Sequence, residues 1–438
     1  MQLFQQHSPP GRSQAVLRLL AAVQLLLMLC TWPLWLHDGR FPAVPLFSAP
    51  TPPPWLLTAV SVAFAAGCLL LMLSRTPDST VPAATATSGA RSASRAGRFP
   101  SLLAALLLCG LLAGCCNQHC LQAWHVFFLW SLLSGCISDR RRQLAALQHI
   151  PACVYVCSGL SRLSLQPEAG PTGMILGQLT EWLPTALLPT PATFRLLCHA
   201  AAWSEALVGG LLLSRGWAGR AAMASAMVLH VALLVALGPL GLNHNPAVLL
   251  WNLCFLLLLP LLYVPPRQPL TTLPQSQSQS QSQPPRWWCI LLWGTSLSGL
   301  VGFTDNWPAW QLYSSRPEQW QLWIDRQHAR QLPPPFSSAI SSTPVDGLLA
   351  VRFDLASLQQ TGSPLYPEDR FQLALIEHVL SALPERCRFR VRIDEPQRWC
   401  WWRRTVREID DRRTLQNEHD SFWLNSRFQL PPASPDRK

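Results

Sequence analysis

FRLLCHAAAWSEALVGGLLLSRGWAGRAAMASAMVLHVALLVALGPLGLNHNPAVLLWNLCFLLLLPLLYV, residues 194–264, is the stretch that decides the fold. From Ala221 to Pro266 the chain has no acidic or basic residue other than His, a run of 46 residues. As a single helix this run would be about 69 Å long, whereas a bilayer core of about 30 Å needs about 20 residues. The run therefore predicts two membrane-spanning helices with a turn at residues 238–246. Leu196–Leu213 predicts a further span, which carries Glu205 in its middle.

Six more apolar runs bring the predicted number of spans to nine. They are Gln14–Leu36, Trp55–Leu73, two spans between Phe99 and Ser138 that are separated by the polar turn Asn117-Gln118-His119, Gln143–Leu163 and Trp287–Phe303. Residues 101–264 are expected to form the main bundle. The segments outside the spans are expected to be a cytoplasmic N-terminus (1–13), a flexible linker (74–100), a Gln/Ser low-complexity linker (265–286) and a C-terminal domain (304–438). The predicted fold class is mainly α, a polytopic transmembrane bundle with a small α+β domain.

The composition agrees with a membrane protein. The chain is 49% hydrophobic and only 13% charged, against roughly 25% charged residues in an average soluble domain. Its net charge of +11 comes almost entirely from arginine, since Lys438 is the only lysine. These arginines lie in short loops between apolar runs, so they indicate membrane orientation and not nucleic-acid binding.

The distribution of the loop arginines predicts a multi-pass protein of the inner (cytoplasmic) membrane of the cell, with its N-terminus inside. With nine spans, twelve arginines fall on the inside and three on the outside or at its margins. The inside residues are Arg12, Arg75, Arg91, Arg95, Arg98, Arg140, Arg141, Arg142, Arg215, Arg220, Arg267 and Arg286; the others are Arg40, Arg162 and Arg195. The C-terminal domain is then extracytoplasmic.

Within that domain, residues 320–324 and 348–355 read as strands, and residues 388–393 alternate with the period of a half-buried strand. Pro367-Glu368-Asp369 opens a predicted helix that extends to Leu383. Cys387 and Cys400 are the only cysteines outside the predicted spans. Because an exported domain lies in an oxidising compartment, they are expected to form a disulfide.

Few polar side chains lie inside the predicted spans, and Glu205, His230 and His149 are the candidates for chemistry. A carboxylate within a membrane normally faces the bundle interior and has a partner. The expected partners of Glu205 are His230 and His149. Two interpretations remain open: a buried polar pair that fixes helix packing, or a proton or ligand site.

Three short motifs resemble those of DoxX-like and HTTM (vitamin K-dependent carboxylase-like) bacterial membrane proteins. They are YVCSGLSR (155–162), SEALVGG (204–210), and His230 together with residues 240–252. DoxX-like and MauE-like proteins are associated with redox systems and thiol maturation, so the resemblance implies a membrane redox or proton-coupled enzyme that uses Glu205 and His230. The carboxylases use a lysine base, and the absence of any lysine before Lys438 argues against that chemistry.

The sequence thus leaves two functional hypotheses. The first is a non-enzymatic membrane component that displays an extracytoplasmic domain. The second is an enzyme of the DoxX/MauE type. The expected partners are the lipid bilayer and other membrane proteins, with no nucleic acid. The sequence names no cofactor and no metal site.

Overall fold

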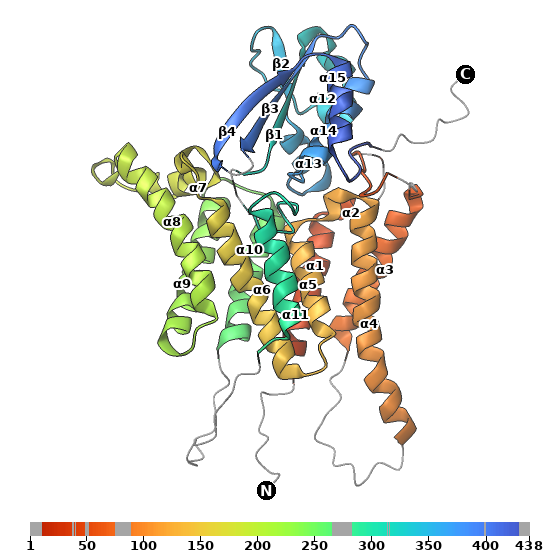
Figure 1. The fold of residues 1–438 in the computed structure, drawn as a ribbon, viewed down its shortest axis with the longest axis vertical. Coiled ribbons are helices and arrows are strands. Elements are labelled where there is room, and N and C mark those ends of the chain that lie inside the picture. Colours follow the sequence, from red (N-terminus) through yellow and green to blue (C-terminus); the bar gives the residue numbers. More distant parts are fainter. Residues whose placement is uncertain are drawn as a thin grey trace.

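The computed structural model describes residues 11–36, 39, 41–48, 52–74, 89–264, 283–312, 314, 316–397 and 400–428. A helical bundle forms its lower part and a smaller α+β domain covers one end (Figure 1). The helices of the bundle are α1 (Arg12–Cys30), α2 (Trp32–Trp35), α3 (Pro54–Leu73), α4 (Gly89–Cys116), α5 (Ala123–Gly135), α6 (Arg140–Ser161), α7 (Pro171–Thr180), α8 (Pro191–Leu212), α9 (Gly216–Leu237), α10 (Pro246–Tyr263) and α11 (Arg286–Gly299). Short 3₁₀ turns lie at η2 (Gln118–Cys120), η3 (Pro167–Ala169) and η4 (Thr185–Leu187).

Six helices of the described chain are long and apolar enough to cross a membrane, namely α1, α3, α4 from Phe99 onward, α6, α9 and α10. The nine predicted spans are therefore not confirmed. Helices α5 and α11 have only 13 and 14 residues, short of the roughly 20 that a span needs. Helix α8 has 22 residues but is less apolar, since it carries Arg195 and Glu205.

Several helix ends were predictable from local sequence. Asn245 accepts a hydrogen bond from the backbone N–H of Ala247, and Pro246 occupies the first position of α10, a favourable pairing at a helix start. Asn243 has a positive φ of 47°, which asparagine tolerates in a turn. The predicted turn at 238–246 is therefore confirmed.

Two linker predictions have different outcomes. Helix α4 begins at Gly89, so the last part of the predicted flexible linker 74–100 is helical, and residues 75–88 lie outside the described residues. Most of the predicted Gln/Ser linker, residues 265–282, also lies outside them.

Helices α6 and α8 approach closely at two glycines. A Cβ atom on Gly159 would lie 2.6 Å from the carbonyl oxygen of Ala202, and one on Gly209 would lie 2.7 Å from that of Ala152. Only glycine allows this separation, as in the small-residue contacts that bring membrane helices together. This crossing places the inward faces of α6 and α8 against each other.

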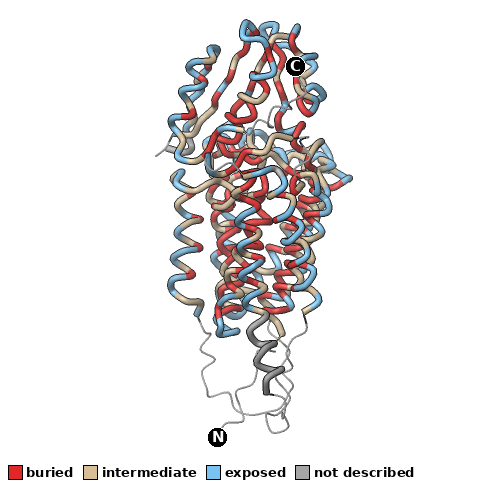
Figure 2. Tube along the Cα trace, turned by 90° about the vertical axis from the view of Figure 1, so that its right-hand side faces the viewer, coloured by how far each residue is buried: buried red, intermediate tan, exposed pale blue. Residues whose placement is uncertain are grey.

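The domain contains a four-stranded antiparallel sheet with the order β2-β1-β3-β4. The strands are β1 (Gln319–Asp325), β2 (Leu348–Val351), β3 (Phe389–Gln397) and β4 (Cys400–Ile409). They are accompanied by η5 (Arg326–Gln331), α12 (Pro334–Ser337), α13 (Phe353–Thr361), α14 (Asp369–Ser381), α15 (Arg412–Asn417) and η6 (Glu418–Ser421). Buried residues line the interior of the bundle and also occur in the domain (Figure 2). In the domain they come mainly from the strands and from α14.

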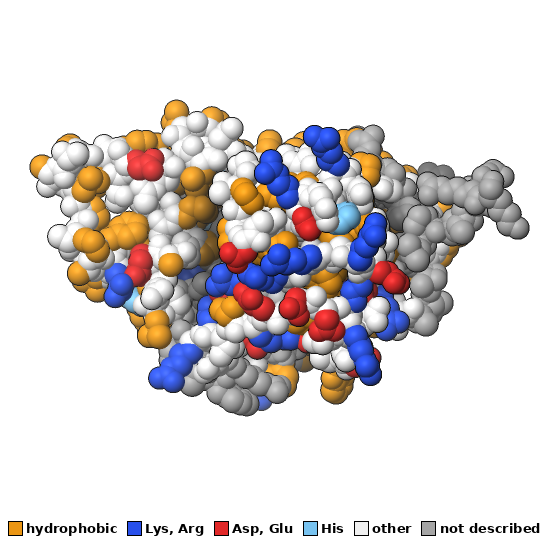
Figure 3. All heavy atoms as spheres, turned by 90° about the horizontal axis from the view of Figure 1, so that it is seen from above, with side chains coloured by type: hydrophobic (Ala, Val, Ile, Leu, Met, Phe, Trp, Pro, Cys, Tyr) orange, Lys and Arg blue, Asp and Glu red, His pale blue; other side chains and the backbone are white. Residues whose placement is uncertain are grey.

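The domain matches the predicted α+β pattern with two differences. The predicted strand 348–355 ends at Val351, and α13 begins at Phe353. Strand β4 was not predicted, because the run CWWRRTVREI does not alternate between apolar and polar residues. Seen from the domain end, charged side chains gather over the domain, whereas the side formed by α7 and α8 is mostly uncharged (Figure 3). Trp182 and Leu187 are among its exposed apolar residues.

Candidate functional site

Glu205 forms a buried ion pair with Arg162 and not with a histidine. Arg162 Nη1 lies 2.6 Å from Glu205 Oε2, and the two side chains are 8% and 7% exposed. The sequence-based expectation that His230 or His149 is its partner is therefore wrong. Arg162 is the C-cap residue of α6, so Glu205 lies level with the domain-facing end of that helix. It does not lie level with the helix centre, as its place in the predicted span suggested.

Arg162 also connects the bundle to the chain that leads into the domain. Its Nη2 donates to Ser158 Oγ at 2.9 Å, and its Nε donates to the carbonyl oxygen of Leu312 at 3.2 Å. Leu312 belongs to the connector between α11 and β1. Each guanidinium nitrogen of Arg162 therefore has a partner, and these partners lie on α6, on α8 and in the connector.

His230 belongs to a second, separate chain of hydrogen bonds. Asn252 Nδ2 donates to the carbonyl oxygen of Val248 at 2.8 Å, so its Oδ1 accepts the proton of His230 Nδ1 at 2.9 Å. His230 Nε2 is then free to accept from the hydroxyl of Tyr155, at 2.6 Å. The chain joins α6, α9 and α10 through a neutral imidazole and ends on a backbone carbonyl.

His149 takes part neither in the ion pair of Glu205 nor in the hydrogen bonds of His230. Its Nδ1 accepts a hydrogen bond of 3.2 Å from Trp293 Nε1 on α11. The three residues singled out from the sequence therefore lie in three different contacts. Sequence reasoning missed Arg162 as a member of the site. The signal was present, because Tyr155, Ser158 and Arg162 recur at helical spacing on one face of α6.

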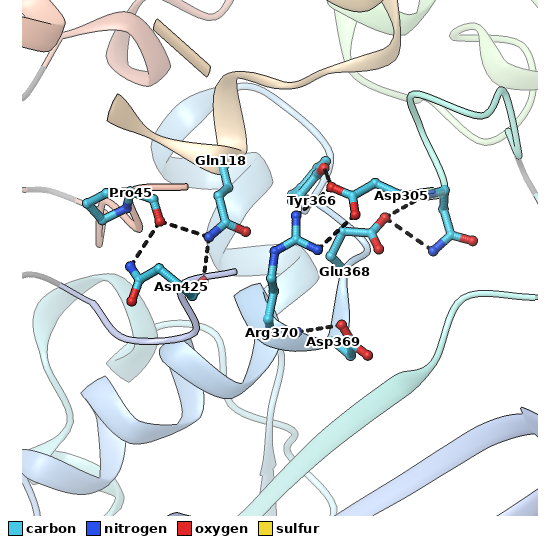
Figure 4. Close-up of polar contacts among 9 residues, drawn as sticks. Pro45, Gln118, Asp305, Tyr366, Glu368, Asp369, Arg370 and Asn425 are labelled. Carbon is cyan, nitrogen blue, oxygen red and sulfur yellow. Dashed lines mark hydrogen bonds and ion pairs between the residues drawn. The ribbon is translucent and has the colours of Figure 1, made fainter. Parts of the chain in front are cut away.

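A larger group of buried polar contacts joins the domain to the bundle. Asp305, just after α11, accepts hydrogen bonds from both terminal nitrogens of Arg370 and from the hydroxyl of Tyr366, the latter at 2.6 Å. The backbone N–H of Asn306 donates to Glu368 Oε1 at 2.6 Å (Figure 4). Trp310 in the same connector is fully buried and has a φ of 61°, a strained geometry that only tight packing maintains.

A second docking contact lies beside the end of α4. Gln118 Nε2 donates to the carbonyl oxygens of Pro45, at 2.9 Å, and of Asn425, at 2.7 Å. Asn425 Nδ2 also donates to Pro45, at 2.9 Å (Figure 4). The three residues are far apart in sequence, so these bonds hold the C-terminal segment of the domain against the loop that precedes α3.

His119 in η2 is a fully buried titratable group of this interface. Its Nε2 lies 3.0 Å from the carbonyl oxygen of Pro364 and 3.2 Å from Ser357 Oγ. Ser357 Oγ itself donates to the carbonyl oxygen of Ser363 at 2.8 Å. A proton on His119 Nε2 pointing at Pro364 leaves no base facing the hydroxyl, so the pair is not an activated nucleophile. Burial lowers the pKa of His119 to about 4, which keeps it neutral.

Three carboxyl groups in this part of the interface, those of Glu318, Glu368 and Asp369, have raised pKa values. Burial, and next the charge of Asp305, hold the pKa of Glu368 well above its usual range. Burial, and next the charge of Asp369, raise the pKa of Glu318 to about 7. Asp305, Glu368 and Asp369 therefore share Arg370, whereas the cation that acts on Glu318 is Arg407. Protonation of a carboxyl group relieves the excess negative charge around Arg370.

The predicted disulfide between Cys387 and Cys400 is wrong. Cys400 lies opposite Gln397 at one end of the β3–β4 hairpin, and Cys387 precedes β3 at the other end. The ten residue steps from Cys387 to Gln397, the partner of Cys400, span roughly 33 Å in extended chain, whereas a disulfide needs Cα atoms within about 7 Å. Cys387 is a free, buried thiol. The side chain of Cys400 lies outside the described residues.

Replacing Glu318 by glutamine is expected to stabilise the folded protein at pH 8 and to have no effect at pH 4. The folded-state pKa is raised from 4.5 to about 7, so the wild type loses stability as the pH rises through that window. Glutamine removes the ionisation, with a gain on the order of 2–3 kcal/mol at most. Thermal unfolding in detergent at both pH values measures this gain. A destabilised variant at pH 8 would contradict the expectation.

Within the part of the chain that the structure describes, no group of three or more His, Cys, Asp or Glu side chains could hold a metal ion. Comparisons with protein families, with characterised proteins and with solved structures gave no match to this chain.

Proposed function

We propose that this chain is a non-enzymatic, multi-pass protein of the bacterial inner membrane that holds a small α+β domain in a fixed position at the outer end of its helical bundle. Six apolar helices are compatible with a multi-pass membrane protein. The contact of Asp305 with Arg370 and Tyr366 carries the proposal, because it fixes the domain to the segment that leaves the last helix of the bundle. A flexibly tethered domain would need no such contact.

The buried polar groups support a structural role for the bundle as well. Arg162 bonds to residues of α6, of α8 and of the connector, so it fixes the helices and the base of the domain together. The hydrogen bonds of His230 likewise join three helices. We infer that the bundle is a rigid platform for the domain.

The proposed orientation of the protein in the membrane rests on the positions of its arginines. In the structure Arg12, Arg140, Arg215 and Arg286 lie at or beside the starts of α1, α6, α9 and α11. These helix starts are at the end of the bundle opposite the domain (Figure 1). Because arginine-rich ends of membrane proteins face the cytoplasm, these positions support a domain that lies outside.

Fusions to topology reporters test this arrangement. Alkaline phosphatase fused after Lys438 is expected to be active, and a fluorescent protein that folds only in the cytoplasm is expected to be dark there. Fusions after Ser74, at the opposite end of the bundle, should show the reverse. Phosphatase that is inactive at Lys438 and active at Ser74 would contradict the proposed orientation.

The second candidate is a membrane redox or proton-coupled enzyme of the DoxX/MauE type. The directed chain from Tyr155 through His230 to Asn252 favours it, since such chains occur in proton relays. A quinone-like chromophore that copurifies in detergent with the wild type, and is lost in His230→Phe, would favour this function over the platform. Membership of the DoxX-like and HTTM group is part of this second proposal and rests on the short motifs.

A further inference from the structure

Trp423 has the most exposed large apolar side chain among the described residues, at 102% of its reference exposure. It follows η6 in the last described segment of the domain. A tryptophan that is fully exposed to water buries no apolar surface on folding and so adds nothing to the stability of the fold. Exposed apolar groups of this kind mark sites that contact a partner or a membrane.

The backbone beside Trp423 is held at the end of a membrane-length helix. Asn425 N donates to the carbonyl oxygen of Leu46 at 3.0 Å, and Leu46 N donates to that of Cys115 at 2.9 Å. Cys115 lies in the last turn of α4. Two chain segments joined by a backbone hydrogen bond lie about 4.8 Å apart, so two such bonds in succession place the backbone at Asn425 roughly 10 Å from the end of α4. Trp423 lies two residues from Asn425 and is therefore near the end of this helix.

The residues around this point are those of a membrane interface. Phe47 follows Leu46 and is 52% exposed, and Trp55 in the first turn of α3 is 67% exposed. Arg427 is exposed on the other side of Asn425. Tryptophan is enriched at the level of lipid headgroups, and arginine near helix ends extends its charge to the interface.

We propose that the segment around Asn425 is a lipid-contacting surface of the α+β domain, in which Trp423 inserts into the interfacial region of the bilayer and Arg427 faces the headgroup phosphates. This inference rests on the proposed membrane position of the bundle. The interfacial region extends about 5–8 Å beyond the hydrocarbon core on each side, which a tryptophan side chain at this height can reach. The domain would then be held both by the bundle and by the lipid surface itself.

Site-specific photo-crosslinking tests the proposal on the full chain. Benzoylphenylalanine replaces Trp423 in protein reconstituted into vesicles of phosphatidylethanolamine and phosphatidylglycerol. Since the side chain is fully exposed, the replacement should fold. We expect a phospholipid adduct at this position by mass spectrometry after irradiation. The matched control is Val406 on β4 of the same domain, which is 51% exposed and should give no lipid adduct.

A third position separates failure of this inference from failure of the proposed function. Leu70 on α3 is 58% exposed and should crosslink to lipid if the bundle spans the membrane. An adduct at Leu70 but none at Trp423 overturns the lipid-contacting surface alone, as does a crosslink from Trp423 to a second copy of the chain. The absence of adducts at both positions overturns the membrane position of the bundle.

Discussion

Replacing Glu205 by leucine is expected to lower the free energy of unfolding by about 3–5 kcal/mol, because it leaves the guanidinium of Arg162 buried without its counter-charge. Both side chains are less than a tenth exposed. Glutamine at this position should cost less than leucine, since its amide oxygen still accepts a hydrogen bond from Arg162. The fraction of detergent-solubilised protein that remains folded at each temperature, compared between the variants and the wild type, measures the difference.

Two further variants distinguish the ion pair from simple packing. Replacing Arg162 and Glu205 together by leucine should recover much of the loss, because buried ion pairs are often replaceable by apolar residues without net cost. Glu168→Gln is the matched control. It removes the carboxylate of a pair with Arg195 whose side chains are 23% and 55% exposed, and little change is expected. A double variant less stable than either single variant, or equal losses for Glu205→Leu and Glu168→Gln, would contradict the buried-pair interpretation.

The helices of the bundle were largely predictable, because runs of apolar residues are strong signals of membrane-length helices. The number of spans was not, since it depends on where a long apolar run bends. Phe99–Ser138 was divided at Asn117-Gln118-His119, and α4 does end there, at Cys116, but the second part of the run forms a helix, α5, of only 13 residues. The turn between them is held by tertiary contacts of Gln118 and His119 with the domain, which no local pattern reveals.

Partners of buried charges were the least predictable feature. Glu205 was matched to the histidines because they lie in neighbouring spans, whereas Arg162 at a helix end appeared to be a loop residue. Asp305 and Arg370 are 65 residues apart in sequence, and only the docking of α14 on the connector brings them together. Strand β4 was missed for a related reason: its arginines pair with acids of other elements, such as Arg407 with Glu418.

Replacing Arg370 by leucine is expected to give the second large effect, again about 3–5 kcal/mol at pH 8. Arg370 is 7% exposed and faces Asp305, with Glu368 and Asp369 next to it in the chain. Without the guanidinium, three neighbouring carboxyl groups remain, and among the described residues only the hydroxyl of Tyr366 donates to the Asp305 carboxylate. We expect the connector between α11 and β1 to become sensitive to protease at the same time.

This loss should become smaller as the pH falls from 8 to 5. Burial and the charge of Asp305 already raise the pKa of Glu368, and removing Arg370 takes away the charge that opposes this rise. A carboxyl group whose pKa is higher in the folded than in the unfolded protein gains stability as the pH falls toward the unfolded value. Arg352→Leu is the control, because its pair with Asp354 is 55% exposed on both sides and should give little change at either pH. A loss for Arg370→Leu that grows on acidification would show that the carboxyl groups are not crowded in the folded state, and the docking role assigned to Asp305 would then have to be abandoned.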